Sequence, residues 1–396
     1  MEQATTSHTR MDRVQPPIVP VIGDIIRQVP GTISLGQGVV HYGPPRAALD
    51  AARAALDVPA THEYQDGAGL ASLVDRIRTK LRLENGIDLE HGSGVMVTVG
   101  ANLAFVHAVG AITEPGDEVI LNVPFYFNHE MAIQMAGCTA VHVATDEHYQ
   151  LRIDAIRQAM TPRTRAIVTI SPNNPSGAVL TTSSLKAVNA LCRDHGLYHI
   201  SDEVYEYFTH GPARHASPGS FEHAGGHTIS MFSLSKAYGF AGWRVGYMVY
   251  PGHLASAMMK SQDTLVVCPP VISQLAAIAA LDAGRAYCDA YVRDLTTVRD
   301  LALDALADLG GLVEVPASDG AFYFLVKVIT AMDPMTLAER LIREHRVAAI
   351  PGTAFGMTDG CSLRVAYGAL QKETVAEGMG RLTRGIRALT KLEGRS

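Results

Sequence analysis

The sequence lacks the features that mark several large classes of protein. Its 33 Lys and Arg residues are outnumbered by 39 Asp and Glu, which gives a formal net charge of −6, so it has no excess of positive charge to attract nucleic acid. No apolar run reaches the roughly 18 residues of a transmembrane helix, and the start MEQATTSHTRMDRVQPP has no signal-peptide core. We therefore expect a soluble cytoplasmic protein that binds neither nucleic acid nor a membrane.

Cysteine is also scarce. Five cysteines are scattered over 396 residues without a C-x-x-C pair, which excludes a disulfide framework and a zinc cluster of the usual spacing. We expect these cysteines to be core thiols and predict no metal site. With 47% hydrophobic and 18% charged residues, the chain has the composition of an ordinary globular protein with a sizeable core.

Short apolar runs alternate with helical stretches in the first two thirds of the chain. The runs are VMVTV (95–99), EVILNV (118–123), AVHVA (140–144), AIVTI (166–170), LYHI (197–200), TISMF (228–232) and VGYMVY (245–250). Such uniformly apolar strands are typical of a sheet covered on both faces by crossover helices. The last two runs are joined by only SLSKAYGFAGWR, which is short for a parallel crossover. We therefore predict an α/β fold whose sheet is mixed, mostly parallel and about seven-stranded.

The last third of the chain has a different order of expected helices and strands. VEVPASDGAFYFLVKV is followed by a helical stretch, then by VAAIPGTAF and CSLRVAYG, an order of elements that indicates a smaller α+β domain. We predict a large domain at residues 46–289 and a small domain formed by residues 1–45 and 290–396.

The strongest local signal for chemistry is the segment SLSKAYGFAGWRVGY at 233–247. A lysine in apolar company loses its proton more readily and becomes a nucleophile toward an aldehyde, which makes Lys236 a candidate. From this segment alone, a surface lysine beside a turn is an equally good interpretation.

Two further polar motifs directly follow predicted strands. SPNNPSG (171–177) comes after AIVTI, and DEVYEYF (202–208) comes after LYHI. In isolation these motifs are an ordinary turn and a solvated strand end. Open α/β sheets, however, bind ligands at the carboxyl ends of their strands. We therefore expect Asn174, Asp202, Tyr205 and Lys236 to converge.

Together these motifs resemble the class I and II aminotransferases of the pyridoxal-5′-phosphate (PLP) enzymes of fold type I. The resemblance runs from SLGQG (34–38) to LRVAYG (363–368), with five separated motifs in the family's order. SPNNPSG corresponds to the family's N-P-x-N-P-T-G, with Ser171 and Ser176 as departures. The resemblance is to the kynurenine, methionine and aromatic aminotransferase group. It implies transfer of an amino group from an L-amino acid, neutral or aromatic, to a 2-oxo acid.

The resemblance also assigns roles around the cofactor ring. Lys236 would hold PLP as an internal aldimine, and Asp202 would pair with the pyridinium nitrogen. Asn174 and Tyr205 would hydrogen-bond the 3′-oxygen, and Tyr126 would stack on the ring. A carboxylate beside the ring nitrogen keeps it protonated, so the ring can accept the electrons released at the substrate Cα.

A phosphate site is expected where the strand at 95–99 leads into a helix. Gly100, Ala101 and Asn102 open this helix, whose free N–H groups and dipole favour an anion. By resemblance, Ser233 and Arg244 would complete the cradle, and an arginine suits a phosphate through its paired donors.

The remaining implied roles concern the substrate and a second subunit. Arg364 would clamp the substrate α-carboxylate, with help from the Gly38 backbone and from Asn174. Tyr64, in EYQDGAGL, would reach the phosphate of the neighbouring subunit. The resemblance thus implies a homodimer with shared active sites.

Residue types leave two questions open. A PLP-dependent lyase or oxidase would use the same side chains, so elimination or oxidation of an amino acid is the alternative to transamination. The natural donor is the second question. Aspartate-specific relatives carry an additional arginine in the stretch that corresponds to 261–274, which here contains no Lys or Arg. We therefore predict that dicarboxylates are poor donors, and that Val39, Val40 and Tyr42 form an apolar pocket with Tyr126.

Overall fold

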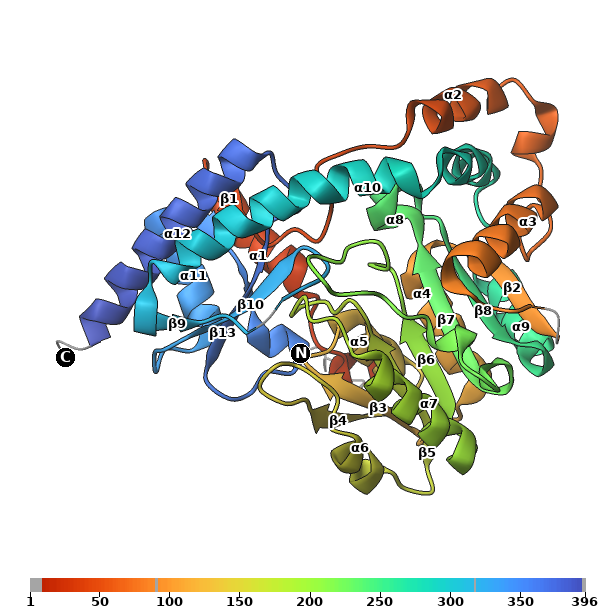
Figure 1. Cartoon of the computed structure of the whole chain (residues 1–396), viewed down its shortest axis with the longest axis horizontal. Coiled ribbons are helices and arrows are strands. Elements are labelled where there is room, and N and C mark those ends of the chain that lie inside the picture. Colours follow the sequence, from red (N-terminus) through yellow and green to blue (C-terminus); the bar gives the residue numbers. More distant parts are fainter. Residues whose placement is uncertain (1–8, 90–91, 317, 394–396) are drawn as a thin grey trace, which may run out of the picture.

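The structure is a computed structural model that describes residues 9–89, 92–316 and 318–393. A seven-stranded sheet in the order β2-β8-β7-β6-β5-β3-β4 lies at its centre (Figure 1). The strands are β2 (Ser93–Thr98), β3 (Glu118–Val123), β4 (Thr139–Ala144), β5 (Thr164–Ile170), β6 (Tyr198–Asp202), β7 (Thr228–Ser233) and β8 (Gly246–Pro251). Only β8 runs antiparallel to its neighbours in this sheet. The predicted mixed, mostly parallel sheet is confirmed, including the antiparallel strand after SLSKAYGFAGWR.

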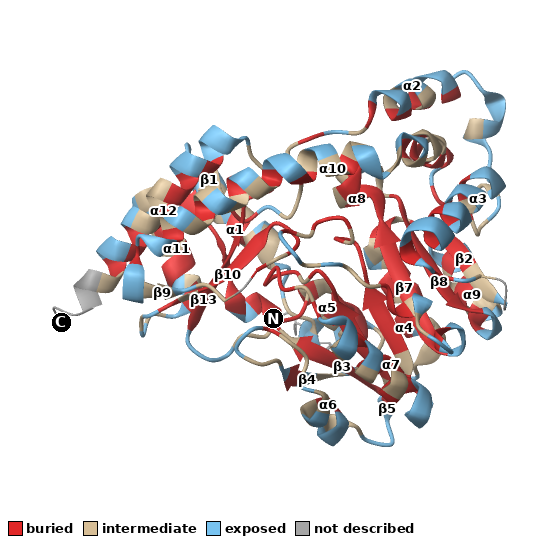
Figure 2. Ribbon diagram, viewed as in Figure 1, coloured by how far each residue is buried: buried red, intermediate tan, exposed pale blue. Residues whose placement is uncertain are grey.

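Helices cover both faces of the sheet. They are α4 (Gly100–Ile112), α5 (Phe127–Met135), α6 (Ile153–Ala159), α7 (Thr182–His195) and α9 (Ala255–Val266), while the short α8 (Leu234–Ala237) lies in the connection between β7 and β8. Val119 and Leu121 of β3 belong to a buried cluster with α4, while Ile120 between them belongs to a second cluster with α7. Because successive side chains of a strand point to opposite faces, a strand buried on both faces has to be apolar throughout. Figure 2 shows these strands buried beneath helices with exposed outer surfaces.

Local signals define individual helix ends. The Thr181 hydroxyl accepts a hydrogen bond from the Ser184 amide at the start of α7, and Gly196 ends the helix with φ at 67°. A side-chain cap of this kind satisfies an amide that has no partner inside the helix, and glycine adopts a positive φ without strain. Thus α7 begins and ends where its sequence provides these two residues.

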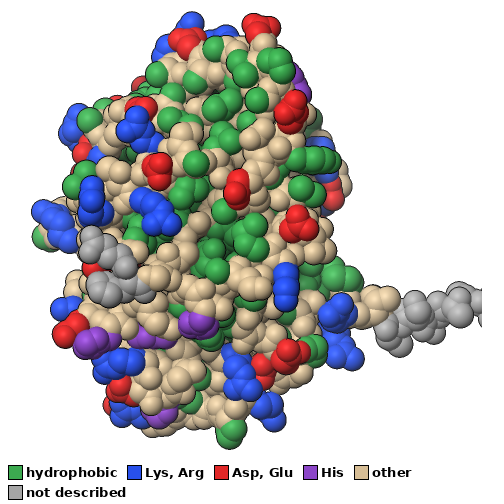
Figure 3. Space-filling view, turned by 90° about the vertical axis from the view of Figure 1, so that its right-hand side faces the viewer, with side chains coloured by type: hydrophobic (Ala, Val, Ile, Leu, Met, Phe, Trp, Pro, Cys, Tyr) green, Lys and Arg blue, Asp and Glu red, His purple; other side chains and the backbone are tan. Residues whose placement is uncertain are grey.

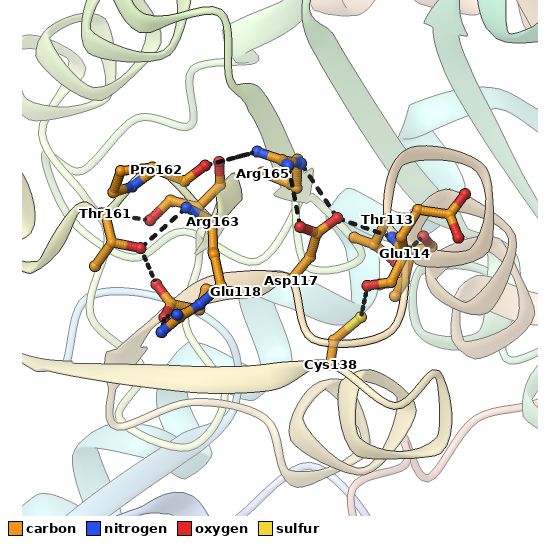
Figure 4. A network of polar contacts seen from close by, with 11 residues as sticks. Thr113, Glu114, Asp117, Glu118, Cys138, Thr161, Pro162, Arg163 and Arg165 are labelled. Atoms are coloured by element: carbon orange, nitrogen blue, oxygen red, sulfur yellow. Dashed lines mark hydrogen bonds and ion pairs between the residues drawn. The ribbon is translucent and has the colours of Figure 1, made fainter.

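The amino ends of β3 and β5 carry a network of ion pairs (Figure 4). Arg163 pairs with Glu118 at 2.6 Å and Arg165 with Asp117 at 3.1 Å. The Thr161 hydroxyl donates to Glu118, and this bond and Arg163 hold the Glu118 pKa below its ordinary value. These groups satisfy one another at the edge of the sheet opposite the carboxyl ends of the parallel strands.

A second set of elements packs beside the sheet. An antiparallel four-stranded sheet has the order β12-β13-β10-β9, and a short parallel pair joins β1 to β11. The strands are β1 (Ile33–Ser34), β9 (Val313–Glu314), β10 (Tyr323–Val328), β11 (Val347–Ala348), β12 (Ile350–Pro351) and β13 (Cys361–Ala366). The helices of this second set are α1 (Ile18–Gln28), α11 (Pro334–His345) and α12 (Lys372–Glu393), whereas α2 (Arg46–Ala55) and α3 (Ala71–Lys80) lie at the other end of the molecule, on the side of β2, and α10 (Val271–Ala307) runs between (Figure 1).

Helix α10 connects the two parts of the molecule. It contacts α2 and α3 as well as α12, and in Figure 1 it runs across the top of the view between them. The expected domain boundary at 289/290 falls inside this helix, whose regular geometry is interrupted at Gly284 with φ at 68°. The division into two domains therefore stays a prediction.

The composition led us to expect buried cysteines and no membrane-spanning helix. Cys138, Cys192, Cys288 and Cys361 are buried, whereas Cys268 is half-buried. Among the helices of the described residues, none has the length and apolar character needed to cross a membrane.

Candidate active site

A cavity of about 310 Å³ lies where the carboxyl ends of the central strands meet the second set of elements. Of the thirteen residues predicted for the site, eleven line this cavity: Gly38, Ala101, Asn102, Tyr126, Asn174, Asp202, Tyr205, Ser233, Lys236, Arg244 and Arg364. They come from α4, the ends of β6 and β7, α8 and β13, and from the segments that follow β1, β5 and β6 or precede α5 and β8. The expected convergence at the carboxyl edge of the sheet is therefore present in the fold.

Lys236 lies in α8, the single helical turn between β7 and β8. Ser233 caps this turn by accepting a hydrogen bond from the Ser235 amide at 3.0 Å. The Lys236 ammonium faces the cavity and donates to the Gly38 carbonyl. Burial, together with the nearby Arg364 and Arg244, lowers the Lys236 pKa to about 8, while Asp202 opposes this shift. More of this amine than of an ordinary lysine is therefore neutral, and so nucleophilic, near neutral pH.

Asp202 is the last residue of β6 and is buried. One carboxylate oxygen accepts from the Val204 amide at 3.2 Å, and the other lies 3.2 Å from His129 Nε2. The His129 ring stacks on Phe105 with centroids 4.0 Å apart. These contacts fix the carboxylate at the bottom of the cavity. His129 was not predicted, because a histidine inside the helical stretch FNHEMAIQM gives no sign that it meets a strand end 73 residues later.

Arg364 is the most constrained cation of the cavity. Its two terminal nitrogens donate to Asn174 Oδ1 at 2.9 Å and to the Gly36 carbonyl at 2.7 Å. Its guanidinium also lies 4.8 Å from the Tyr323 ring centroid and 5.0 Å from that of Phe355. Such contacts hold a buried cation in one orientation. Arg364 Nε is buried and has no hydrogen-bond partner in the described part of the chain.

The start of α4 and Arg244 form a second cationic corner. Gly100 has φ at 76°, and a Cβ at this position would collide with the Arg244 guanidinium. Arg244 is further held by the Ala241 carbonyl at 2.8 Å. The absence of a side chain at Gly100 thus lets an arginine lie against the amino end of a 13-residue helix. Free amides, a helix dipole and a guanidinium together favour a phosphate-like anion.

Comparison with known proteins decides the family. The sequence profile of the family described as aminotransferase class I and II matches residues 30–382. The chain belongs to the class I and II aminotransferases. It is 34% identical to the aromatic aminotransferase ISS1 of Arabidopsis thaliana, covering 94% of each chain. It is also 34% identical to the aspartate/prephenate aminotransferase of Thermus thermophilus, covering 91% of this chain and 92% of that protein.

Solved structures agree with the sequence comparison. The aromatic aminotransferase of Pyrococcus horikoshii OT3 superposes with a TM-score of 0.86 at 32% identity, covering 93% of this chain and 99% of that one. The relatives and solved structures are named aminotransferases, which supports transamination over elimination or oxidation.

The aminotransferase cavity also contains residues that the sequence did not reveal. Tyr323 places its hydroxyl 2.8 Å from that of Tyr205, and Ser235 and Val19 line the wall. Tyr323 stands in the apolar run of β10, where a buried core tyrosine is the simplest interpretation. The register of β10 against β13 could have identified it, because Leu325 faces Arg364 and Tyr323 lies two residues along the same face.

The predicted side-chain pocket is only partly present. Val39 lines the cavity, and Tyr126 lines it from the start of α5 while accepting a hydrogen bond from Asn128 at 2.8 Å. Val40 and Tyr42 do not line it. Tyr42 stacks instead on Tyr291 with centroids 3.9 Å apart and donates to the Lys236 carbonyl at 3.2 Å. Tyr42 therefore supports the backbone that carries Lys236.

The two other predicted residues lie outside the cavity lining. Gly100 is directly behind the wall, against Arg244. Tyr64 is 82% exposed on the surface of the single chain. One copy of the chain therefore does not bring Tyr64 to its own site.

Proposed function

We propose that this aminotransferase holds PLP in the cavity and uses it to move the amino group of a neutral or aromatic L-amino acid to a 2-oxo acid. The observation that carries the proposal is one cavity in which a lysine with a lowered pKa faces a buried carboxylate and a buried arginine. These are Lys236, Asp202 and Arg364.

The donor set fits PLP at each of its functional groups. The amino end of α4 with Ser233 and Arg244 suits the phosphate, and the Lys236 amine suits the aldehyde carbon. Asp202, held by His129, suits the ring nitrogen. When bound, PLP supplies an electron sink for the bond that breaks at the substrate Cα. A Cβ on Gly100 would collide with Arg244, so the glycine lets this arginine lie at the start of α4, where the phosphate would be held.

The protein's own residues would orient the substrate and move its proton. Arg364 would bind the α-carboxylate, and Asn174 Oδ1 holds one of its nitrogens in place. Paired hydrogen bonds between an arginine and the substrate carboxylate would fix which Cα bond is aligned for cleavage. The Lys236 Nζ, neutral in part because of its pKa, would carry the proton to and from Cα. Asp202 would keep a proton on the ring nitrogen.

A neutral donor is favoured by the charges of the cavity. In the described part of the chain, the cations that line it are Lys236, Arg244 and Arg364, and each already has a partner in the proposed complex. The wall also contains Val19 and Phe127. A second substrate carboxylate would be desolvated without a cation, which costs several kcal/mol.

A donor panel tests the substrate proposal. Phenylalanine, tyrosine, methionine, glutamine, kynurenine and aspartate are compared by kcat/KM at fixed 2-oxoglutarate with PLP-loaded protein. We expect a neutral or aromatic donor to exceed aspartate, although relatives named for aromatic and for aspartate substrates are equally similar in sequence. A clear preference for aspartate over every neutral amino acid would overturn the proposed donor class.

We further propose a homodimer whose second copy completes the site. The face that carries α2, α3 and α9 has hydrophobic side chains gathered across its middle (Figure 3). Exposed large apolar residues on these and adjoining segments are Leu56, Val58, Tyr64, Leu265 and Val267. The region of Tyr64 and that of Val267 are neighbours, because a Cβ on Gly67 would lie 3.1 Å from the Val267 carbonyl.

Val267 adds a backbone argument for a covered surface. It has φ at 63° and ψ at −65°, and the Cys268 amide bonds the Val266 carbonyl at 2.7 Å. This is a γ-turn of the strained, positive-φ form, in a β-branched residue that is 41% exposed. Strained backbone of this kind persists where its surroundings fix it, and a second copy of the chain would supply such surroundings.

The cytoplasmic location expected from the sequence remains a prediction.

A further inference from the structure

Two tyrosine hydroxyls meet inside the cavity. Tyr205, in the segment after β6, and Tyr323, the first residue of β10, have their hydroxyl oxygens 2.8 Å apart, and the two side chains are buried. Each phenol has one hydrogen to donate. In the bond between them, therefore, one tyrosine uses its hydrogen and the other keeps its own for a different acceptor.

The surroundings of Tyr323 leave its hydroxyl few alternatives. A Cβ on Gly38 would lie 2.8 Å from the Tyr323 hydroxyl oxygen, so that side is closed by the Gly38 backbone. The Arg364 guanidinium covers the ring, and a cation accepts no hydrogen bond. Within the described part of the chain, the hydroxyl of Tyr205 is the hydrogen-bond partner of Tyr323.

Both phenols have a raised pKa in this buried setting. Burial raises the pKa of Tyr323 to about 12, with Arg364 opposing the rise. Burial raises the pKa of Tyr205 well above its ordinary value, and Tyr323 adds to that rise. Both phenols therefore keep their hydrogens, and the direction of the bond between them follows from the contacts of Tyr323.

We propose that Tyr323 is a positioning residue that donates its hydroxyl hydrogen to Tyr205 and so directs the Tyr205 hydrogen into the cavity, toward the phenolic oxygen of PLP. This inference rests on the proposed function. Donation from Tyr323 also polarises the Tyr205 hydroxyl and makes it a stronger donor. Tyr323 itself acts only through Tyr205.

The test is the pH midpoint of the visible absorption change of the PLP-loaded protein. A donor to the phenolic oxygen favours its ionised form and lowers this midpoint. Tyr205→Phe removes that donor, and we expect the midpoint to rise by about 1–2 pH units, the range for a hydrogen bond to a charged group. Tyr323→Phe should raise it by a smaller amount, roughly half a unit. The double variant should match Tyr205→Phe alone.

A matched control is Tyr367→Phe. Tyr367 is fully buried, and its hydroxyl bonds His210 and the Ala321 carbonyl outside the cavity. We expect this variant to leave the midpoint unchanged. Replacement of Tyr323 by 3-fluorotyrosine keeps the side-chain shape and makes the phenol more acidic, so it should lower the midpoint. That variant tests the proposal even where Tyr323→Phe folds poorly.

The outcomes separate this inference from the proposal beneath it. A wild-type midpoint in Tyr323→Phe, with a raised midpoint in Tyr205→Phe, overturns the positioning role. A double variant shifted further than Tyr205→Phe also overturns it, because Tyr323 would then act independently. A rise with 3-fluorotyrosine reverses the direction of donation and overturns it as well. A wild-type protein that binds no PLP, in contrast, refutes the proposed function itself.

Discussion

Removal of the Lys80 charge should destabilise the protein strongly, because Lys80 is the buried cation behind the segment that carries Asp202 and Tyr205. Its ammonium lies 2.5 Å from both Glu206 carboxylate oxygens and 2.8 Å from Asn85 Oδ1. The side chains of Lys80 and Glu206 are 6% and 9% exposed. Lys80→Met therefore leaves Glu206 as a buried carboxylate without its cation.

The expected size follows from this burial. Breaking a buried ion pair by removing one partner costs about 3–5 kcal/mol. With an unfolding entropy of about 2.1 cal/mol/K per residue, a chain of 396 residues has about 0.8 kcal/mol/K, so Tm should fall by about 4–6 °C. Thermal unfolding of the PLP-free protein, followed by circular dichroism at one fixed protein concentration, measures the shift.

Two further variants make the result interpretable. Lys80→Met combined with Glu206→Met removes both charges and should recover most of the lost Tm, because an apolar pair of similar volume often replaces a buried ion pair without loss. Lys372→Met, at an exposed lysine, should change Tm by less than about 1 °C. An unchanged Tm in Lys80→Met, or a double variant less stable than the single one, would refute the reasoning.

Three other predictions concern the site. Because only the neutral amine attacks an aldehyde, the rate at which PLP labels Lys236 in the PLP-free protein should rise with a midpoint near pH 8; a midpoint near the ordinary 10.5 would contradict the lowered pKa. Arg364→Lys should raise KM for the amino donor roughly tenfold or more, since one paired contact is lost, and an unchanged KM would place the α-carboxylate elsewhere. Subunits with Lys236→Ala mixed with Tyr64→Phe subunits should regain activity above either parent, because one hybrid site lacks both defects; no gain despite proven subunit exchange would count against shared sites.

The sheet and the core of the site were predictable because both depend on short-range patterns. Strands buried on both faces have to be apolar throughout, which makes them visible as runs in the sequence. Polar residues that follow such runs lie at one edge of a parallel sheet. Asn174 and Asp202 follow β5 and β6 in this way, and Lys236 follows β7. Their convergence needed no knowledge of side-chain packing.

The missed residues depend on packing between distant segments. His129 reaches Asp202 from the first turns of α5, and Tyr323 reaches Tyr205 across 118 residues. Neither contact follows from periodicity, because it depends on where one helix packs and on the register of β10 with β13. Tyr42 is not a pocket residue for the same reason, because its ring stacks on Tyr291 of α10. The domain boundary expected at 289/290 lies inside α10 and stays a prediction.

The segment DEVYEYF is not the solvated strand end that its sequence also allowed. Asp202 and Tyr205 face the cavity, while Glu203 and Glu206 point behind it. Glu203 is fully buried and lies 2.9 Å from His215, and Glu206 pairs with Lys80. A solvated strand end would leave all four side chains free to move. Their burial on two sides fixes the backbone between them, and a fixed backbone is what Asp202 and Tyr205 require to hold positions within a fraction of an ångström. Glu203 and Glu206, which take no part in the proposed chemistry, thus hold Asp202 and Tyr205 in place.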